Sequence, residues 1–173
     1  LQPTTDQVSA FNASFEEIRE SQKRHTIGAA LIKAGEIHWI GHFGEQAPGV
    51  PASNDTMFNV GSITKTVTTQ TILQLVNQKK ISLDESMSKY WVDPDLKDDP
   101  RHNLLTPRMV LRHNTGLPNW RYFSADRKLK FQNTPGEQYE YSGEGFEYLA
   151  KFAEKKLNTP FAELAKKHVF EPA

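Results

Sequence analysis

One stretch of the chain constrains its fold more than any other, namely FNVGSITKTVTTQTILQLV at residues 58–76. Apolar residues recur in it with the spacing of one helix face, at Ile63, Val67, Ile72, Leu75 and Val76. The β-branched threonines between them lower the intrinsic helix propensity, so packing must hold a helix there. The sequence therefore predicts a deeply buried helix, capped by Asn59, Gly61 or Ser62.

The chain before this helix predicts another helix followed by a β-hairpin. Apolar residues of segment 6–24 recur at spacings of three and four, which is typical of an amphipathic helix. Residues 27–33 and 36–43 have the composition of two strands around a tight turn at Ala34 and Gly35. We expect the helix to cover one face of this hairpin.

Further helices are predicted in the second half of the chain. Thr106 and Pro107 form a standard start, as cap and first-turn proline, for a short helix over residues 106–112. The apolar spacing predicts an amphipathic helix over residues 146–157 and a last short helix over residues 160–168.

Composition and charge argue against several classes of function. Lys plus Arg and Asp plus Glu both number 21, and no basic run marks a nucleic-acid arm, so we do not expect nucleic acid as a partner. The chain has no cysteine, which excludes disulfides, thiolate nucleophiles and zinc ribbons. No apolar run approaches the roughly 18 residues that cross a bilayer, so no membrane span is expected. The hydrophobic fraction of 37% is lean for a self-sufficient globule.

Ser62 and Lys65 are three residues apart, so they share one face where the helix begins. A serine hydroxyl is a weak nucleophile unless a nearby base takes its proton, and a lysine can do so only where burial or a second cation lowers its pKa. The positive end of the helix dipole disfavours an ammonium and favours an alkoxide. The pair is chemically competent, although a cap serine beside a solvated lysine gives the same pattern, which arises by chance about once in a chain of this length.

Four segments occur in an order that resembles a known superfamily: FNVGSITK, ILQLVNQKKISLDESMSKY, TPRMVLRHNTGLP and TPGEQYEYSGEGFEYLAKFAEKK. Together they are similar to the serine β-lactamase and penicillin-binding-protein superfamily, most closely to its class C β-lactamase, D-aminopeptidase and esterase branch. The resemblance implies an α/β (α+β) fold of the β-lactamase/transpeptidase type, with an antiparallel sheet, covering helices and a mostly helical domain. We expect residues 1–50 to contribute a helix and hairpin to the sheet domain and residues 51–173 to form the helical domain.

The resemblance also implies roles for individual residues. Ser62 is the acylated nucleophile and Lys65 its partner in proton transfer, while Tyr141, in the segment YSG, completes the acid/base set. A phenol can take this role if a neighbouring ammonium stabilises its anion; otherwise Tyr141 is a loop tyrosine that packs its ring. His113 is expected to pack and to form hydrogen bonds rather than to act as a base. The positions expected to bind substrate are Asn119, Ser142 and Gly143.

The activity implied is that of a serine hydrolase that forms an acyl-enzyme on an amide, ester or β-lactam carbonyl. Its partner is a small molecule or peptide with a reactive carbonyl, and the chemistry requires no cofactor and no metal. We expect a periplasmic or secreted location.

Two departures from the family pattern bear on this function. The family carries asparagine at the third position of Tyr-x-Asn, where this chain has Gly143, so no side-chain amide is there to hold a substrate's acylamino group. The chain also ends before a Lys-Thr-Gly or His-x-Gly strand, which supplies the second backbone N–H of the oxyanion hole. We therefore expect an incomplete copy that lacks the C-terminal strands, is inactive alone, and is completed by a missing segment or a second chain.

Three alternatives stay open at this point. A catalytically inert β-lactamase-like binding or assembly module keeps the fold without the chemistry. A metal site at His38 and His42 is disfavoured, because that spacing in a strand separates the two residues by roughly 13 Å. A glycosidase-like carboxylate pair is disfavoured as well, since acidic residues suit the start and the exposed face of a helix; the candidates are Glu137, Glu140, Glu144 and Glu147.

Overall fold

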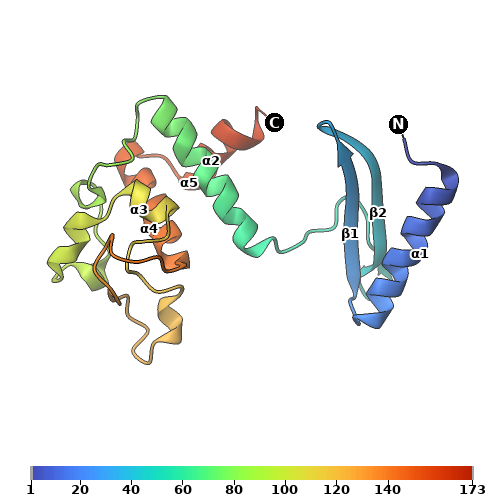
Figure 1. Ribbon diagram of the computed structural model, residues 1–173, viewed down its shortest axis with the longest axis horizontal. Coiled ribbons are helices and arrows are strands. Elements are labelled where there is room, and N and C mark those ends of the chain that lie inside the picture. Colours follow the sequence, from blue (N-terminus) through green and yellow to red (C-terminus); the bar gives the residue numbers. More distant parts are fainter. Residues whose placement is uncertain (1, 173) are drawn as a thin grey trace. The chain divides into compact units, whose positions relative to one another are not determined.

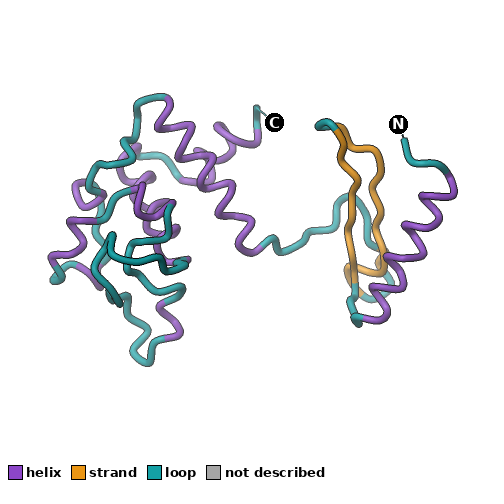
Figure 2. Tube along the Cα trace, viewed as in Figure 1, coloured by secondary structure: helices purple, strands orange, loops and turns teal. Residues whose placement is uncertain are grey.

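The computed structural model describes residues 2–172, which form two compact units (Figure 1). The first unit extends to Asn59 and the second begins at Val60. The sequence led us to expect a division at residue 50. All the strands described belong to the first unit, and the second is built of helices and loops (Figure 2).

In the first unit a helix precedes a three-stranded antiparallel sheet with the strand order β1, β2, β3. The elements are α1 (Thr5–Ser21), β1 (Thr26–Lys33), β2 (Glu36–Ala47) and β3 (Val50–Pro51). The turn between β1 and β2 places Ala34 and Gly35 at positive φ, 51° and 81°. Two such residues match the twist of the flanking strands in a two-residue hairpin. The predicted helix and hairpin are therefore confirmed.

Aromatic side chains hold α1 against the sheet. The ring of Phe15 stacks on those of Trp39 and Phe43 in β2, with centroids 5.7 Å and 5.5 Å apart. Phe11 contacts Trp39 at 5.3 Å. Trp39, Gly41 and Phe43 alternate onto one face of the strand, and a Cβ at Gly41 would lie 2.5 Å from the Trp39 ring and 2.7 Å from the Phe43 ring. The glycine thus makes room for the two rings that α1 covers.

The second unit contains four α-helices within its described residues, joined by loops and short 3-10 turns. The helices are α2 (Thr64–Asn77), α3 (Pro107–Leu111), α4 (Gly143–Leu157) and α5 (Phe161–Ala165). The 3-10 turns are η1 (Gly61–Ile63), η2 (Met87–Lys89), η3 (Pro94–Leu96), η4 (Pro100–Leu104) and η5 (Arg121–Phe123), and η6 (Lys166–Phe170) is a π-helical turn. None of the described helices has the length and apolar character that crossing a membrane requires.

Helix α2 enters the core of the second unit from Thr68 onward. Thr68, Thr71, Ile72 and Leu75 are buried there. The hydroxyl of Thr71 donates to the carbonyl oxygen of Val67 over 2.8 Å, which satisfies its hydrogen bonding inside the core. Ile63, just before α2, is 63% exposed. The prediction of a deeply buried helix is thus correct for the second half of the segment and wrong for its start.

A short turn precedes this helix, because η1 runs directly into α2. Val60, which precedes η1, and Ile63, which precedes α2, make no side-chain capping hydrogen bond, and these cap positions differ from the predicted Asn59, Gly61 and Ser62. The backbone N–H of Thr64 donates to the carbonyl oxygens of Gly61 and Ser62, which supplies the acceptors that a cap would otherwise provide.

The remaining helices begin largely as the sequence predicts. The Thr106 side chain accepts a hydrogen bond from the backbone N–H of Met109 at 3.3 Å, and Pro107 is the first residue of α3. Helix α4 ends at Leu157, where Asn158 adopts a left-handed conformation. The last predicted helix is α5 followed by η6 rather than one continuous α-helix.

These helices and loops enclose one hydrophobic core. Its largest fully buried side chains include Ile72, Leu75, Met87, Leu96, Leu105, Leu117, Leu129, Tyr148, Leu149 and Phe152.

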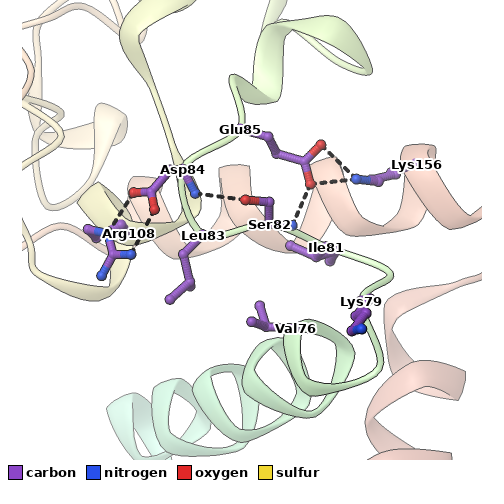
Figure 3. A pocket seen from close by; sticks show the side chains of 9 residues that line it. All are labelled: Val76, Lys79, Ile81, Ser82, Leu83, Asp84, Glu85, Arg108 and Lys156. Atoms are coloured by element: carbon purple, nitrogen blue, oxygen red, sulfur yellow. Dashed lines mark hydrogen bonds and ion pairs between the residues drawn. The ribbon is translucent and has the colours of Figure 1, made fainter.

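A cavity of about 480 Å³ lies where the loop after α2 meets α3 and α4 (Figure 3). Ion pairs between its lining side chains span it. Arg108 holds Asp84 through two hydrogen bonds of 2.6 Å and 2.8 Å, and Lys156 binds both carboxylate oxygens of Glu85, one of them at 2.6 Å. These two ion pairs tie the loop to the two helices.

Candidate active site

The structure brings the side chains of Ser62, Lys65 and Tyr141 together. Ser62 lies in η1, Lys65 in the first turn of α2, and Tyr141 just before α4. The Lys65 Nζ donates to Ser62 Oγ over 3.2 Å, and the Tyr141 hydroxyl donates to the same oxygen over 2.8 Å. A serine oxygen can accept both bonds, so one nucleophilic group is held between an amine and a phenol.

Aromatic rings surround the Lys65 ammonium. Its Nζ lies 4.9 Å from the ring centroid of Tyr141 and 5.7 Å from those of Trp120 and Phe146. The negative face of each ring attracts a cation at this distance. The cage therefore stabilises a positive charge beside the Tyr141 hydroxyl.

The same surroundings make Tyr141 a stronger acid. Hydrogen bonding with Ser62 and then with Lys65 lowers the pKa of Tyr141 from its ordinary value of 10.0, and the positive charge of Lys65 adds to this effect. Both groups stabilise the phenolate, Ser62 by donating its own hydroxyl hydrogen once the phenol is ionised. Tyr141 can thus act as a proton acceptor below the pH at which an isolated tyrosine would.

Tyr141 is positioned by the start of α4, which Ser142 and Asn119 cap. The buried Ser142 hydroxyl accepts from the Gly145 N–H at 2.9 Å and donates to the carbonyl oxygen of Pro118 at 2.7 Å. The Asn119 side-chain oxygen accepts from the Gly143 N–H at 3.1 Å. The sequence led us to expect that Ser142 and Asn119 bind substrate. In the structure both side chains hold the start of the helix, and the Ser142 hydroxyl is buried, while a role of Asn119 in binding substrate stays a prediction.

The ring of His113 packs against the ring of Tyr141. Its ring stacks on that of Tyr141, with centroids 4.5 Å apart and planes at 26°, and it also contacts Phe146. Its Nδ1 accepts a hydrogen bond from the Ser142 N–H at 3.1 Å. Burial first, and then the charge of Lys65, lower the pKa of His113, so the ring is neutral at pH 7. His113 therefore packs and forms hydrogen bonds, as expected from the sequence.

Gly143 lies against the indole of Trp120, which the sequence analysis missed. A Cβ built on Gly143 would be 2.5 Å to 2.8 Å from three atoms of that ring, well inside van der Waals contact. Trp120 is separated from Gly143 by more than twenty residues and follows the loop segment GLPN, where no periodicity indicates a partner. Only the folded arrangement reveals that the two residues fit together.

A cluster of charges next to the site was missed as well. The Arg121 guanidinium binds Glu144 and Asp93 at 2.8 Å each and Asp95 at 3.1 Å. The hydrogen bonds to Glu144 and Asp93 raise the pKa of Arg121 further above its already high value. We expected the glutamates to lie at the start and on the exposed face of a helix, and Glu144 does lie in the first turn of α4 but is only 5% exposed. The expected exposure was wrong, because Arg121 of η5, distant in sequence, neutralises Glu144.

The other carboxylates and histidines considered from the sequence lie elsewhere. Glu137 and Glu147 are exposed, and Glu140 accepts a hydrogen bond from Asn133. His38 and His42 belong to β2 of the first unit.

Comparison with known proteins places this arrangement in a family. The model of the family described as Beta-lactamase matches residues 11–173. The chain belongs to the beta-lactamase family. This membership agrees with the resemblance found in the sequence, and the mixed helix and antiparallel sheet architecture is that of the β-lactamase/transpeptidase-like fold.

Individual members of the beta-lactamase family and its wider superfamily show how far the likeness extends. The D-alanyl-D-alanine-carboxypeptidase/endopeptidase AmpH of Escherichia coli (strain K12) is 25% identical over 83% of this chain and 42% of its own length. The penicillin-binding protein homologue from Pyrococcus abyssi has a TM-score of 0.77 at 23% identity and covers 95% of this chain and 42% of its own. D-amino acid amidase from Ochrobactrum anthropi SV3 has a TM-score of 0.79 at 20% identity, covering 97% and 51%. The chain thus spans about half or less of the length of these relatives.

Proposed function

We propose that the protein is a serine hydrolase that forms an acyl-enzyme at Ser62. The observation that carries the proposal is that Ser62 Oγ accepts hydrogen bonds from both the Tyr141 hydroxyl, at 2.8 Å, and Lys65 Nζ, at 3.2 Å. Nucleophilic catalysis by a serine needs a base within this reach. The names of two relatives, a carboxypeptidase/endopeptidase and an amidase, support a substrate with a reactive carbonyl.

In the mechanism we propose, Tyr141 is the base and Lys65 the cation that stabilises its phenolate. The Tyr141 phenolate takes the proton of the Ser62 hydroxyl as Ser62 Oγ bonds to the carbonyl carbon of an ester or amide. The tetrahedral intermediate then collapses, the bond to the leaving group breaks, and Tyr141 returns the proton to the departing oxygen or nitrogen. Ser62 is left as an ester of the acyl group.

Hydrolysis of the acyl-enzyme uses the same groups in reverse. Tyr141 takes a proton from a water molecule, whose oxygen attacks the ester carbonyl. The bond to Ser62 Oγ breaks, the proton returns to that oxygen, and the carboxylic acid is released. Lys65 keeps its positive charge throughout, which fits its position among three aromatic rings.

The proposal is tested by covalent labelling of the full-length protein with a fluorescent fluorophosphonate, which bonds to activated serines. We expect the wild-type protein to be labelled at Ser62, as located by mass spectrometry of its peptides, and the Ser62→Ala variant to stay unlabelled. Lys65→Ala should slow labelling by roughly 10²- to 10⁴-fold, because the phenolate loses its stabilising cation.

The matched control is Ser82→Ala, which removes an exposed serine outside the site. This variant should be labelled at the wild-type rate. Labelling that persists in Ser62→Ala, or a wild-type protein that never reacts, would refute the proposal and favour an inert module that keeps the fold.

A further inference from the structure

Trp120 and Gly143 interlock beside the reacting groups. Because a Cβ at Gly143 would meet the six-membered ring of Trp120 at 2.5 Å, only glycine lets the indole take its present position. The centroid of that indole is 5.7 Å from Lys65 Nζ. The Trp120 indole therefore lies next to Lys65, in the space that a side chain at position 143 would otherwise occupy.

The position of Trp120 is fixed by its neighbours. Its ring stacks on Tyr122, with centroids 5.8 Å apart and planes at 15°, and Tyr122 contacts Phe123 at 4.6 Å. Arg121, between these residues, is anchored to Glu144 of α4 by its backbone N–H at 2.9 Å as well as by its side chain. The indole is thus held from its own segment and from the start of α4.

A cavity of about 490 Å³ opens beside Trp120. Phe123 and Phe131 contribute further aromatic lining, and the polar lining residues are Asn119, Ser124, Asp126, Lys128, Lys130, Gln132 and Glu140. Pockets that hold small organic ligands are of this size. Trp120 links this cavity to the reacting groups, since it lines the cavity and also lies over Lys65.

We propose that Trp120 selects substrates that carry a flat apolar group, such as a phenyl ring, next to the reacting carbonyl. This inference rests on the function proposed above and names its substrate class. The indole surface that lines the cavity offers apolar contact to another ring, whereas it cannot pair with both the N–H and the C=O of an acylamino group. An acylamino substituent placed there would lose its hydrogen bonds to water without replacement.

Two measurements in the full-length protein test this selectivity. The first compares kcat/KM for the p-nitrophenyl esters of phenylacetic acid and of N-acetylglycine, which differ in a phenyl against an acylamino group. The second measures binding of phenylacetamide and N-acetylglycinamide to the Ser62→Ala variant by NMR titration, which requires no catalysis. We expect the phenyl compound to be preferred in both.

Variants at positions 120 and 143 show whether the preference for the phenyl compound depends on the contact between Trp120 and Gly143. Trp120→Ala should reduce the preference by about 3- to 10-fold, the range expected for one aromatic pair, whereas Trp120→Phe keeps a flat ring and should retain most of it. Gly143→Ala should reduce it too, because its Cβ displaces the indole. The double variant with both alanines should lose no more than Trp120→Ala alone, since the two residues act as one unit.

The control is Phe170→Ala, which removes an aromatic side chain that is 62% exposed and lies outside this cavity, and which should leave the preference unchanged. A Trp120→Ala variant that binds and hydrolyses the two compounds in the wild-type ratio would overturn the inference even if Ser62 is labelled. Conversely, a phenyl preference in binding without any labelling of Ser62 would support the subsite and refute the hydrolase.

Discussion

Tyr141 lies between the Lys65 ammonium and the His113 imidazole ring. Lys65 Nζ is 4.9 Å from the centre of the phenol ring, and the His113 ring stacks on it at 4.5 Å. Because burial and Lys65 lower the pKa of His113 below its usual 6.5, the imidazole is neutral at pH 7. A single positive charge, that of Lys65, then acts on Tyr141.

The first prediction concerns Tyr141 itself. Tyr141→Phe keeps the ring that packs against His113 but removes the group that takes the Ser62 proton. We expect fluorophosphonate labelling and ester hydrolysis to fall by roughly 10²- to 10⁴-fold, the usual worth of one acid/base group. The thermal midpoint should change little, because Tyr141 is 38% exposed. Tyr122→Phe, which also removes one exposed hydroxyl, serves as the control and should react normally.

The second prediction is a pH profile with a defined direction. The phenolate is the active form, and its neighbours lower the pKa of Tyr141 below 10.0. The second-order rate of labelling should therefore rise with pH and level off below pH 10, earlier than a free phenol would allow. This rise is followed by measuring labelling rates between about pH 5 and pH 10, corrected for hydrolysis of the probe. A rate that falls as the pH rises would contradict Tyr141 as the base.

At the scale of elements, the start of α4 is the frame of the site. Each of its first three backbone N–H groups has an acceptor: the Asn119 side chain for Gly143, the Asn119 carbonyl for Glu144, and the Ser142 hydroxyl for Gly145. These bonds join the loop before η5 to the helix that follows Tyr141. The loop and the helix are thereby joined, with the phenol of Tyr141 and the indole of Trp120 both near Lys65.

The third prediction tests the charges that complete this frame. Arg121→Met removes the partner of Asp93 and Glu144, whose side chains are only 7% and 6% exposed, and leaves both carboxylates without a cation. Breaking a buried ion pair in this way costs about 3 kcal/mol or more, so the free energy of unfolding should fall by that amount. Urea unfolding of the full-length protein measures it.

Arg108→Met is the matched control for Arg121→Met. Arg108 also binds a carboxylate through two hydrogen bonds, but its side chain is 47% exposed and that of Asp84 is 66% exposed. Solvent screens such a pair, so its loss should change the stability far less. Equal effects of the two substitutions would show that the Arg121 cluster adds no special stability.

Across the whole molecule, the features that the sequence predicts well are those that depend on residues close together in the sequence. The hairpin turn at Ala34 and Gly35 and the start of α3 at Thr106 and Pro107 are local patterns with a local cause. The approach of Ser62 and Lys65 is also local, since a helical turn alone brings them together. Tyr141 was placed beside them by resemblance, not by any local rule.

Features that join distant segments were missed or wrongly predicted. The fit of Gly143 to Trp120 and the burial of Glu144 against Arg121 depend on pairs more than twenty residues apart. The sequence does not show which ring will pack against a glycine or which cation will neutralise a buried glutamate.

Stability should depend on pH in two separate steps. The pKa values of His113 and His168 are lowered from 6.5, first by burial and then by nearby lysines, so the unfolded chain binds these protons more readily than the folded one. Their contribution is complete above pH 6.5 and is lost as the pH falls below it. A hydrogen bond from Lys130 lowers the pKa of Asp126 to about 2, so its contribution is lost only below its ordinary value of 3.8.

The fourth prediction is therefore a first decline in stability between about pH 7 and pH 5, ahead of acid unfolding. Urea midpoints of the full-length protein at half-unit pH intervals measure it. His168→Gln should flatten this decline in part, since its ring is replaced by a side chain that does not titrate, while the second decline below pH 4 should stay. A midpoint that is constant from about pH 7 to pH 5 would mean that the folded protein accepts protons at both histidines as easily as the unfolded chain does.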